Sequence, residues 1–258
     1  MMTPVTTIDP DADFATYYKS GRDPDETCKR LYQWHQMLWG RTVHGVAPFQ
    51  LEVAYRGRFE LNLITADGKR FRLGSDGIVN TWTSPGWARR YAFGSDLVAE
   101  IAADTDDFYR IASTIGGYIV FPLNSPDQAG NTINQARGVH PLIADRFDLT
   151  LECIRRHYAE RDSADLVRDE DNPLRDRLAC YGDFFGLFAD FDTYVRFFLL
   201  DDLLTPDRRA VRSLLSGNPL NSFAPPALAA TPEQYAEFRR NSIAFVMGRN
   251  ARIRQLGF

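Results

Sequence analysis

A chain of 258 residues, of which 44% are hydrophobic and 25% are charged, has the composition of an ordinary globular protein, not that of a disordered tail or a fibrous repeat. Its net charge of −4 argues against a strongly basic nucleic-acid-binding coat. Arginine accounts for 27 of the 30 basic residues. This skew suits recognition of phosphate or carboxylate, although GC-rich coding produces it as well.

The three cysteines, Cys28, Cys153 and Cys180, lie far apart and form no CxxC or Cys/His spacing, so we expect neither a disulfide framework nor a zinc site. The N-terminal residues are acidic where a secretory signal would be basic, and no stretch approaches ~18 uninterrupted apolar residues. These features predict a cytoplasmic protein with no membrane partner. The oligomeric state stays open.

The expected fold class is α+β, an antiparallel β meander in the N-terminal half packed against a mainly helical C-terminal half. We expect a single domain over residues 1–258. Within it, residues 1–20 are expected to be loosely ordered, residues 22–130 to mix strands and helices, and residues 131–258 to be mainly helical.

The first expected element is a helix that begins at residues 23–26 (DPDE) and ends near residue 40. An acid at the N-cap, proline at the first helical position and glutamate at the third favour this start. One face of the helix then carries the residues expected to be buried: Cys28, Leu31, Tyr32, His35 and Leu38.

The apolar period then changes to two, which predicts strands. Apolar side chains alternate along residues 51–55 and again along residues 59–63, and a turn at residues 67–68 (DG) leads into a third strand over residues 69–73. Gly-Ser-Asp follows at residues 74–76 and recurs further along the chain. Two matches of this length cannot establish an internal repeat. We therefore interpret the tripeptide as a strand end that is capped by Ser or Asp.

The second Gly-Ser-Asp, at residues 94–96, is expected to begin a helix that Gly116 and Gly117 end before a short buried strand at residues 118–121. Residues 184–200 are apolar almost all round, which predicts a helix or helix pair in the centre of a core. Residues 231–234 (TPEQ) cap a final helix. Its expected inward face contains Tyr235, Phe238, Ser242, Phe245 and Val246.

Polar chemistry is concentrated between residues 132 and 158. A loop at residues 123–131 leads into residues 132–138 (TINQARG), where side chains such as Asn134 crowd around Arg137 and Gly138 permits a close backbone approach. A helix is expected from near residue 143. Its core stripe consists of Phe147, Leu151, Ile154 and Tyr158. Its neighbouring polar stripe consists of Arg146, Thr150, Cys153 and His157.

This pattern suggests a site that binds an anionic group. Arg137 and Arg146 are assigned to grip a phosphate or carboxylate, and His157, with Glu152 or Asp145 nearby, to transfer a proton. The residues assigned to substrate binding are Arg137, Arg146, Asn134, Thr150 and Arg156. The alternative is that Arg146, Glu152, Arg155 and Arg156 form a solvated charged face and that His157 is a half-buried packing residue.

No GxGxxG, P-loop, GxSxG or HExxH motif occurs. The four histidines are scattered along the chain, so a histidine-rich metal centre is not expected, whereas magnesium bound by carboxylates stays open. The sequence therefore names no cofactor.

Residues 132–138 (TINQARG) and residues 145–158 (DRFDLTLECIRRHY) resemble motifs of a family of uncharacterised bacterial proteins known only as a domain of unknown function. Residues 19–25, 117–122 and 181–188 also fit the pattern of that family, so the resemblance covers nearly the whole chain. It implies a bacterial, self-contained protein and carries no activity with it.

Our leading hypothesis is an enzyme, or an effector such as a toxin or phage-defence component, acting on a phosphate-bearing nucleotide or RNA. The alternative is a non-catalytic regulatory protein that binds nucleic acid or an acidic protein partner through its C-terminal helix. The arginines available for that role are Arg239, Arg240, Arg249, Arg252 and Arg254.

Overall fold

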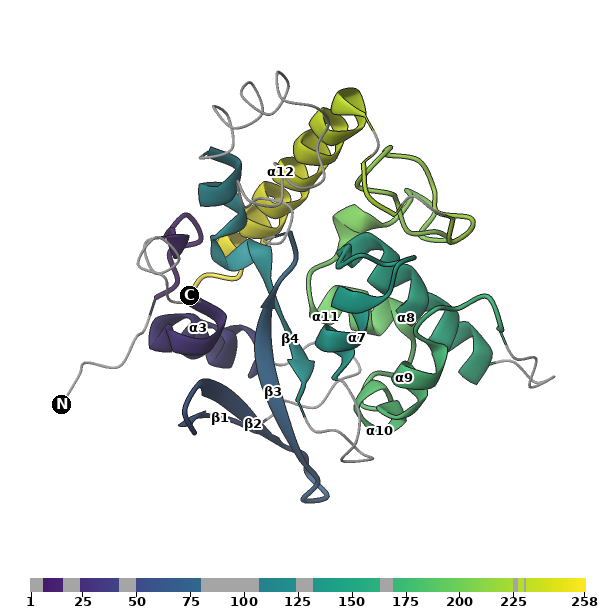
Figure 1. Cartoon of the computed structure of the whole chain (residues 1–258). Helices are drawn as coiled ribbons and strands as arrows, with labels where there is room; N and C mark the ends of the chain where they lie inside the picture. The colour runs from purple at the N-terminus through teal and green to yellow at the C-terminus, as the bar shows by residue number, and fades with distance from the viewer. Residues whose placement is uncertain are drawn as a thin grey trace.

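The computed structural model of the chain describes residues 7–15, 24–41, 50–79, 107–123, 132–162, 169–224, 227–229 and 231–258. A four-stranded antiparallel sheet lies between an N-terminal helix on one side and a group of C-terminal helices on the other (Figure 1). The expected α+β class is confirmed, with the strands in the N-terminal half and the longer helices mainly in the C-terminal half.

The sheet has the strand order β1-β2-β3-β4. Its strands are β1 (Gln50–Tyr55), β2 (Phe59–Ile64), β3 (Arg70–Gly77) and β4 (Tyr118–Pro122). The first three form the expected meander, and the expected buried strand joins them as β4, with all five residues buried. Leu61 and Leu63 of β2 are fully buried, as the period of two predicts.

The expectation that the strand stops before residues 74–76 is wrong. Gly74, Ser75 and Asp76 lie within β3, where Ser75 pairs with Val120 and Asp76 pairs with Ile119. The partner strand β4 supplies the backbone hydrogen bonds, so these residues need no cap. The second Gly-Ser-Asp, at residues 94–96, lies outside the described residues.

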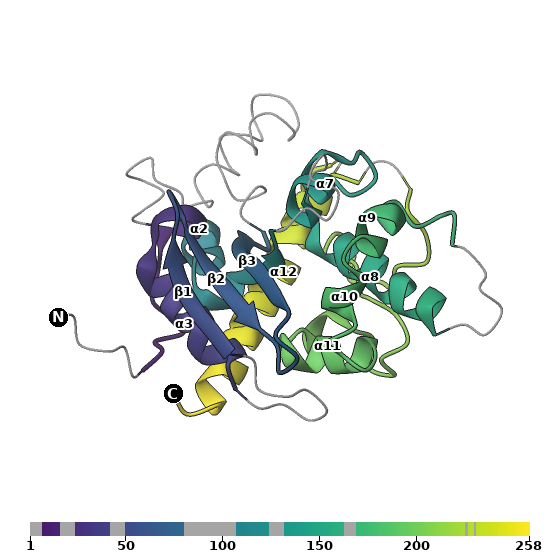
Figure 2. The same ribbon diagram turned by 90° about the horizontal axis from the view of Figure 1, so that it is seen from below.

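The first expected helix is two helices, α2 (Pro24–Thr27) and α3 (Lys29–Trp39), because Cys28 between them is extended, with φ −89° and ψ 98°. Figures 1 and 2 show α3 on the side of the sheet opposite to the group of C-terminal helices. Gln36 of α3 donates to the carbonyl of Leu51 at 2.6 Å, which ties the helix to the edge strand β1.

Part of the segment expected to be loosely ordered is packed. In residues 7–15, Ile8 and Phe14 are buried, and the Phe14 ring lies 5.3 Å from the ring of Trp34 and 6.0 Å from that of Tyr118. These two apolar side chains are enough to dock the segment on α3 and β4, although acidic residues surround them. The remainder of residues 1–20 lies outside the described residues.

Residues 107–112 are helical, and a 3-10 turn, η1 (Ile115–Gly117), connects them to β4. A Cβ atom on Gly117 would lie 1.8 Å from the carbonyl oxygen of Ala112. Glycine is therefore the residue that allows the chain to turn here, as expected from the Gly116-Gly117 pair. The start expected for this helix, near residue 94, lies outside the described residues.

The C-terminal helices lie beyond β4, apart from the last one, which runs past the end of the sheet (Figures 1 and 2). They are α7 (Ile133–Val139), α8 (Phe147–Arg161), α9 (Arg175–Ala179), α10 (Gly182–Phe185), α11 (Phe191–Phe197) and α12 (Pro232–Gln255), with a 3-10 turn, η2 (Asp201–Leu203), before the last of them. No helix of the described segments is long and apolar enough to cross a membrane.

Helix α8 begins at Phe147 and not near residue 143, because Ala144 and Asp145 adopt positive φ values of 46° and 62°. The expected core stripe is confirmed, since Phe147, Leu151, Ile154 and Tyr158 are all buried. Burial of each such side chain stabilises the fold by roughly 1.5–3 kcal/mol. Apolar residues from both halves of the chain belong to one continuous core.

The aromatic segment forms the expected pair of helices, α10 and α11, and each helix buries one apolar face in the core while its other face is exposed. Phe188 between them packs against Tyr194 at 5.2 Å and against Phe197 at 5.3 Å. Helix α12 begins as expected, with the Thr231 side chain accepting from the Gln234 backbone at 3.3 Å. The five residues expected to face inward from α12 are buried.

Candidate functional site

Arg137 on α7 is fully buried and is bonded by side chains from four parts of the chain. Its Nε donates to Thr150 Oγ1 at 3.2 Å, and its Nη1 contacts Asn134 Oδ1 at 3.2 Å and Asp145 Oδ1 at 2.7 Å. Nη1 also pairs with Asp76 of β3. We call these five residues the Arg137 cluster.

Four residues named for the sequence-predicted site meet in this cluster, namely Asn134, Arg137, Asp145 and Thr150. Thr150 suits its place because its hydroxyl donates to the Arg146 carbonyl at 2.9 Å and so leaves its oxygen free to accept from Arg137. The close approach expected at Gly138 is wrong, since a Cβ atom there would meet nothing within 4 Å.

Asp145 is the unusual member of the cluster. Its backbone has φ 62°, its amide donates to the Arg137 carbonyl at 3.0 Å, and its own carbonyl accepts from Arg137 Nη2 at 2.7 Å. Burial raises the pKa of the Asp145 carboxyl above its ordinary value of 3.8, and the charge of Arg137 opposes that rise. Left-handed backbone and a perturbed carboxyl together are typical of functional sites.

The side chains of Asp76 and Asp145 each keep 15% of their surface exposed, whereas Arg137 between them keeps none. Because both carboxylates bind the same guanidinium nitrogen, their oxygens lie close together. The cluster carries two formal negative charges and one positive charge, and its partly exposed members are the two carboxylates and Asn134, whereas Arg137 and Thr150 are buried.

Arg146 is also buried, but its guanidinium faces away from the cluster. Its Nε donates to Asp148 at 3.1 Å, its Nη1 to the Ala227 carbonyl at 2.8 Å, and its Nη2 to Ser213 Oγ at 3.1 Å. Asp148 in turn accepts from the Leu214 amide at 2.7 Å. Arg146 therefore joins the start of α8 to the 213–214 and 227 segments, and each of its three guanidinium nitrogens is engaged within the protein.

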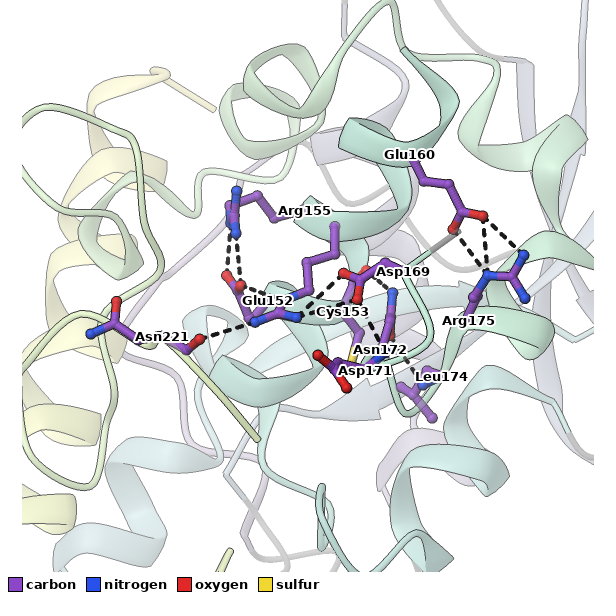
Figure 3. Close-up of polar contacts among 11 residues, drawn as sticks. Glu152, Cys153, Arg155, Glu160, Asp169, Asp171, Asn172, Leu174, Arg175 and Asn221 are labelled. Atoms are coloured by element: carbon purple, nitrogen blue, oxygen red, sulfur yellow. Dashed lines mark hydrogen bonds and ion pairs between the residues drawn. The ribbon is translucent and has the colours of Figure 1, made fainter. Parts of the chain in front are cut away.

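Glu152 of α8 belongs to a second polar group, in which it faces Arg155 and lies near Asp169 (Figure 3). It is 1% exposed and binds Arg155 through both carboxylate oxygens at 2.8 Å, and it binds Arg156 at 2.9 Å. Arg156 continues to Asp169 at 3.3 Å and to the Asn221 carbonyl at 3.2 Å. These bonds fasten two loops to the helix.

The alternative of a solvated charged face is therefore wrong for Arg146 and Glu152, which are both buried. These charges can be buried because each has a partner of opposite sign within the protein, which offsets the free-energy penalty of removing the charge from water.

His157 lies apart from both groups. It is half-buried, its ring lies 5.2 Å from that of Phe185, and its Nε2 has no hydrogen-bond partner among the described residues. Burial, and then the charge of Arg161, lower the pKa of His157 below its ordinary value of 6.5. Thr150 and His157 are separated by about 10 Å along α8, given a rise of about 1.5 Å per residue.

Two cavities lie near these groups. One, of about 450 Å³, lies between α12 and residues 201–217 and includes Ser213 in its wall. The other, of about 430 Å³, lies between α7 and α9 and includes His140 and Arg175. In the described part of the chain, no group of three or more His, Cys, Asp or Glu side chains has an arrangement that could hold a metal ion.

The C-terminal arginines, proposed for nucleic-acid binding, mostly contact other parts of the chain. Arg249 is fully buried, Arg252 pairs with Asp202 at 2.7 Å, and Arg254 pairs with Asp11 at 2.6 Å. Arg240 pairs with Glu237, and Arg239 lies over the ring of Phe108. No row of free cations therefore follows the described face of α12.

A family model described as "Family of unknown function (DUF6994)" matches residues 8–253. The chain belongs to this family. The resemblance to an uncharacterised family is thus confirmed, and the DUF6994 match spans the sheet, the C-terminal helices and every predicted site residue. Searches of curated proteins and of solved structures found no match to this DUF6994 member.

Sequence reasoning missed Asp76 as a partner of Arg137 in this DUF6994 protein. The sequence does show an aspartate directly after the apolar residues of a strand, but we interpreted that aspartate as a cap of the strand end. No local pattern indicates that residue 76 lies beside residue 137, because only the pairing of β3 with β4 and the packing of α7 bring them together.

Proposed function

We propose that the protein is an enzyme that acts on a phosphate-bearing substrate, a nucleotide or RNA, with Asp145 as its proton-transfer group. In this proposal Arg137 is a positioning residue that holds Asp145 and Asp76 side by side. His157, first considered for proton transfer, is given a packing role.

The observation that carries the proposal is the convergence of two partly exposed carboxylates on one fully buried guanidinium. A purely structural ion pair needs one carboxylate per arginine, and a second adds repulsion that costs stability. The left-handed backbone of Asp145 adds strain at the same point. Costly features of this kind concentrate where chemistry requires them.

The charge of the cluster affects whether it can bind a phosphate-bearing substrate. Two ionised aspartates would repel a phosphate, but the raised pKa of Asp145 makes its neutral acid easier to reach than that of an ordinary aspartate. A neutral carboxylic acid donates a hydrogen bond to a phosphate or leaving-group oxygen, which a carboxylate does not do. Asp145 is therefore assigned as the general acid, with Asp76 as the accompanying carboxylate.

Asp145→Asn tests the proposal with little change in shape, because asparagine tolerates positive φ. We expect wild-type protein to convert at least one member of a panel of nucleoside phosphates and single-stranded RNA, and Asp145→Asn to be about 10²- to 10⁴-fold slower. Products are followed by ion-exchange chromatography and gel electrophoresis. Asp171→Asn, at an exposed aspartate, is the matched control and should keep full activity. Equal rates for the two variants would rule out the assigned role.

The pH dependence of the rate follows from the assigned role. A general acid works only when protonated, so the rate should fall as pH rises through the pKa of Asp145, which lies above 3.8. The fall should disappear from the residual activity of Asp145→Asn. A rate that increases over the same range would make Asp145 a base instead.

His157→Phe separates this proposal from the earlier assignment. The ring of His157 already packs against Phe185 and has no described partner at Nε2, so we expect a change in stability below about 1 kcal/mol and an unchanged rate. Thermal denaturation and the same activity assay measure both. A large loss of rate in a folded His157→Phe protein would return proton transfer to His157.

If the enzyme serves as a toxin or phage-defence effector, expression of the wild-type protein in bacteria should slow growth or restrict phage. The Asp145→Asn protein, expressed at the same level, should do neither. Growth curves and plaque counts distinguish an effector from a housekeeping enzyme.

A further inference from the structure

The cavity between α12 and residues 201–217 is separate from the Arg137 cluster, and no residue of the cluster lines it. Its volume of about 450 Å³ falls in the range of roughly 300–1,000 Å³ that is usual for small-molecule sites. The charged residues in its wall are two aspartates and two arginines, so their pairing decides which ligand the cavity prefers.

Both aspartates of the wall already bind arginines. Asp201 pairs with Arg208 at 2.7 Å, and Asp202 pairs with Arg252 through both of its oxygens. Arg208 is also held by a second carboxylate, because its Nε donates to Asp192 at 2.5 Å. These pairs leave little negative charge for a cationic ligand.

Arg212 is the exception in the wall. Its backbone is fixed, since its amide donates to the Leu203 carbonyl at 2.7 Å, but its guanidinium makes one bond, from Nε to the Gly217 carbonyl at 3.3 Å. Among the described residues, no carboxylate pairs with Arg212. The cavity wall therefore has one exposed guanidinium that is not paired with a carboxylate among the described residues, although Glu237 lies nearby, and its two terminal nitrogens are free to bind an anion in bidentate fashion.

The remainder of the wall is partly apolar, with Leu204, Leu214 and Phe245 among its residues. Asn241 adds one polar group. Its Nδ2 donates to the Leu214 carbonyl and to Glu237, both at 3.0 Å, whereas its Oδ1 has no donor among the described residues. A ligand that fits has an anionic end and an apolar body, and Asn241 Oδ1 can accept from any donor that the ligand carries.

We propose that this cavity binds a small organic anion, a carboxylate or phosphate monoester with an apolar body, through Arg212. The site is braced from behind by the buried pair of Arg146 and Asp148, because Arg146 donates to Ser213 Oγ at 3.1 Å and Asp148 accepts from the Leu214 amide at 2.7 Å. Both Ser213 and Leu214 line the cavity. This proposal does not depend on the catalytic role of Asp145.

The test uses the full chain and four probes: hexanoate, phenylacetate, phenyl phosphate and hexylamine. We expect at least one of the three anions to raise the melting temperature by about 5 °C at concentrations well above its Kd, and hexylamine to have no effect. Arg212→Gln should weaken the binding of that anion roughly 10- to 100-fold by calorimetry, since it removes a charge-assisted contact. The control Arg209→Gln removes the same charge from an exposed neighbour outside the cavity and should bind normally.

Ala244→Phe provides a test that leaves every charge in place. Ala244 is an exposed position of α12 that also lines the cavity, so a larger side chain there should fold and block the ligand. Binding of carboxylates alone or of phenyl phosphate alone supports the site and identifies its anion. The proposal is overturned if no anion binds, if hexylamine binds instead, if Arg209→Gln weakens binding as much as Arg212→Gln, or if Ala244→Phe binds like the wild type.

Discussion

Replacing Arg137 with methionine is expected to lower the free energy of unfolding by about 3–5 kcal/mol. Arg137 is fully buried and binds Asp76, Asp145 and Thr150, so methionine fills its space but leaves two neighbouring carboxylates without a counter-charge. The loss comes mainly from those stranded charges and not from packing. Urea unfolding at pH 7 measures it.

A triple variant isolates the cause of that loss. Adding Asp76→Asn and Asp145→Asn to Arg137→Met removes both stranded charges, so a large part of the lost stability should return. Arg209→Met, at an exposed arginine, should change stability by less than about 1 kcal/mol. If the triple variant is no more stable than Arg137→Met, packing and not charge holds the cluster together.

Much of the fold could be predicted because it depends on local patterns. Alternating apolar residues identified β1 to β3, and the spacing of Phe147, Leu151, Ile154 and Tyr158 identified the buried face of α8. Periodicity reports which face of an element is buried, since burial on one side is what creates the pattern.

The errors occurred where tertiary contacts overrule local preference. Residues 143–146 have no helix-breaking glycine or proline, yet Ala144 and Asp145 take positive φ, because the Asp145 backbone is bonded on both sides by Arg137. A cap was expected at Ser75 and Asp76 for a similar reason, since the sequence does not reveal that β4 continues the sheet there.

In the candidate site, too, the local patterns were predicted correctly and the contacts between distant segments were not. The crowd of polar residues around Arg137 was visible in the sequence, and Asn134 and Thr150 do contact it. The polar stripe of α8 was also real, but side chains on one stripe need not share a partner. Arg146 turns toward Ser213, whereas His157 packs against Phe185. Contacts between distant segments decided these roles.

Arg249 presents a second buried guanidinium, and its replacement by methionine is expected to cost about 3 kcal/mol. Its Nε donates to the Phe198 carbonyl at 3.0 Å, and its Nη1 donates to the carbonyls of Gly116 and Tyr118 at 2.9 and 2.5 Å. No carboxylate pairs with it among the described residues, and it lies over the ring of Trp39 at 5.6 Å.

Two opposing effects set the size of that loss. Burial, followed by the charge of Arg41, lowers the pKa of Arg249 to about 9, so the native state holds this cation at a cost that methionine would remove. Methionine also leaves three buried carbonyls without a donor, at about 1–3 kcal/mol each, and this term is the larger. Arg249→Lys, which keeps a cation but has a shorter reach, should lose about half as much.

Arg252→Met is the matched control for Arg249→Met, since it lies one turn further along α12 and its pair with Asp202 is about one-third exposed. It should cost less than about 1 kcal/mol by urea unfolding. If Arg249→Met is as stable as Arg252→Met, the three carbonyls have found other partners. The guanidinium would then not be what joins α12 to β4 and to the end of α11.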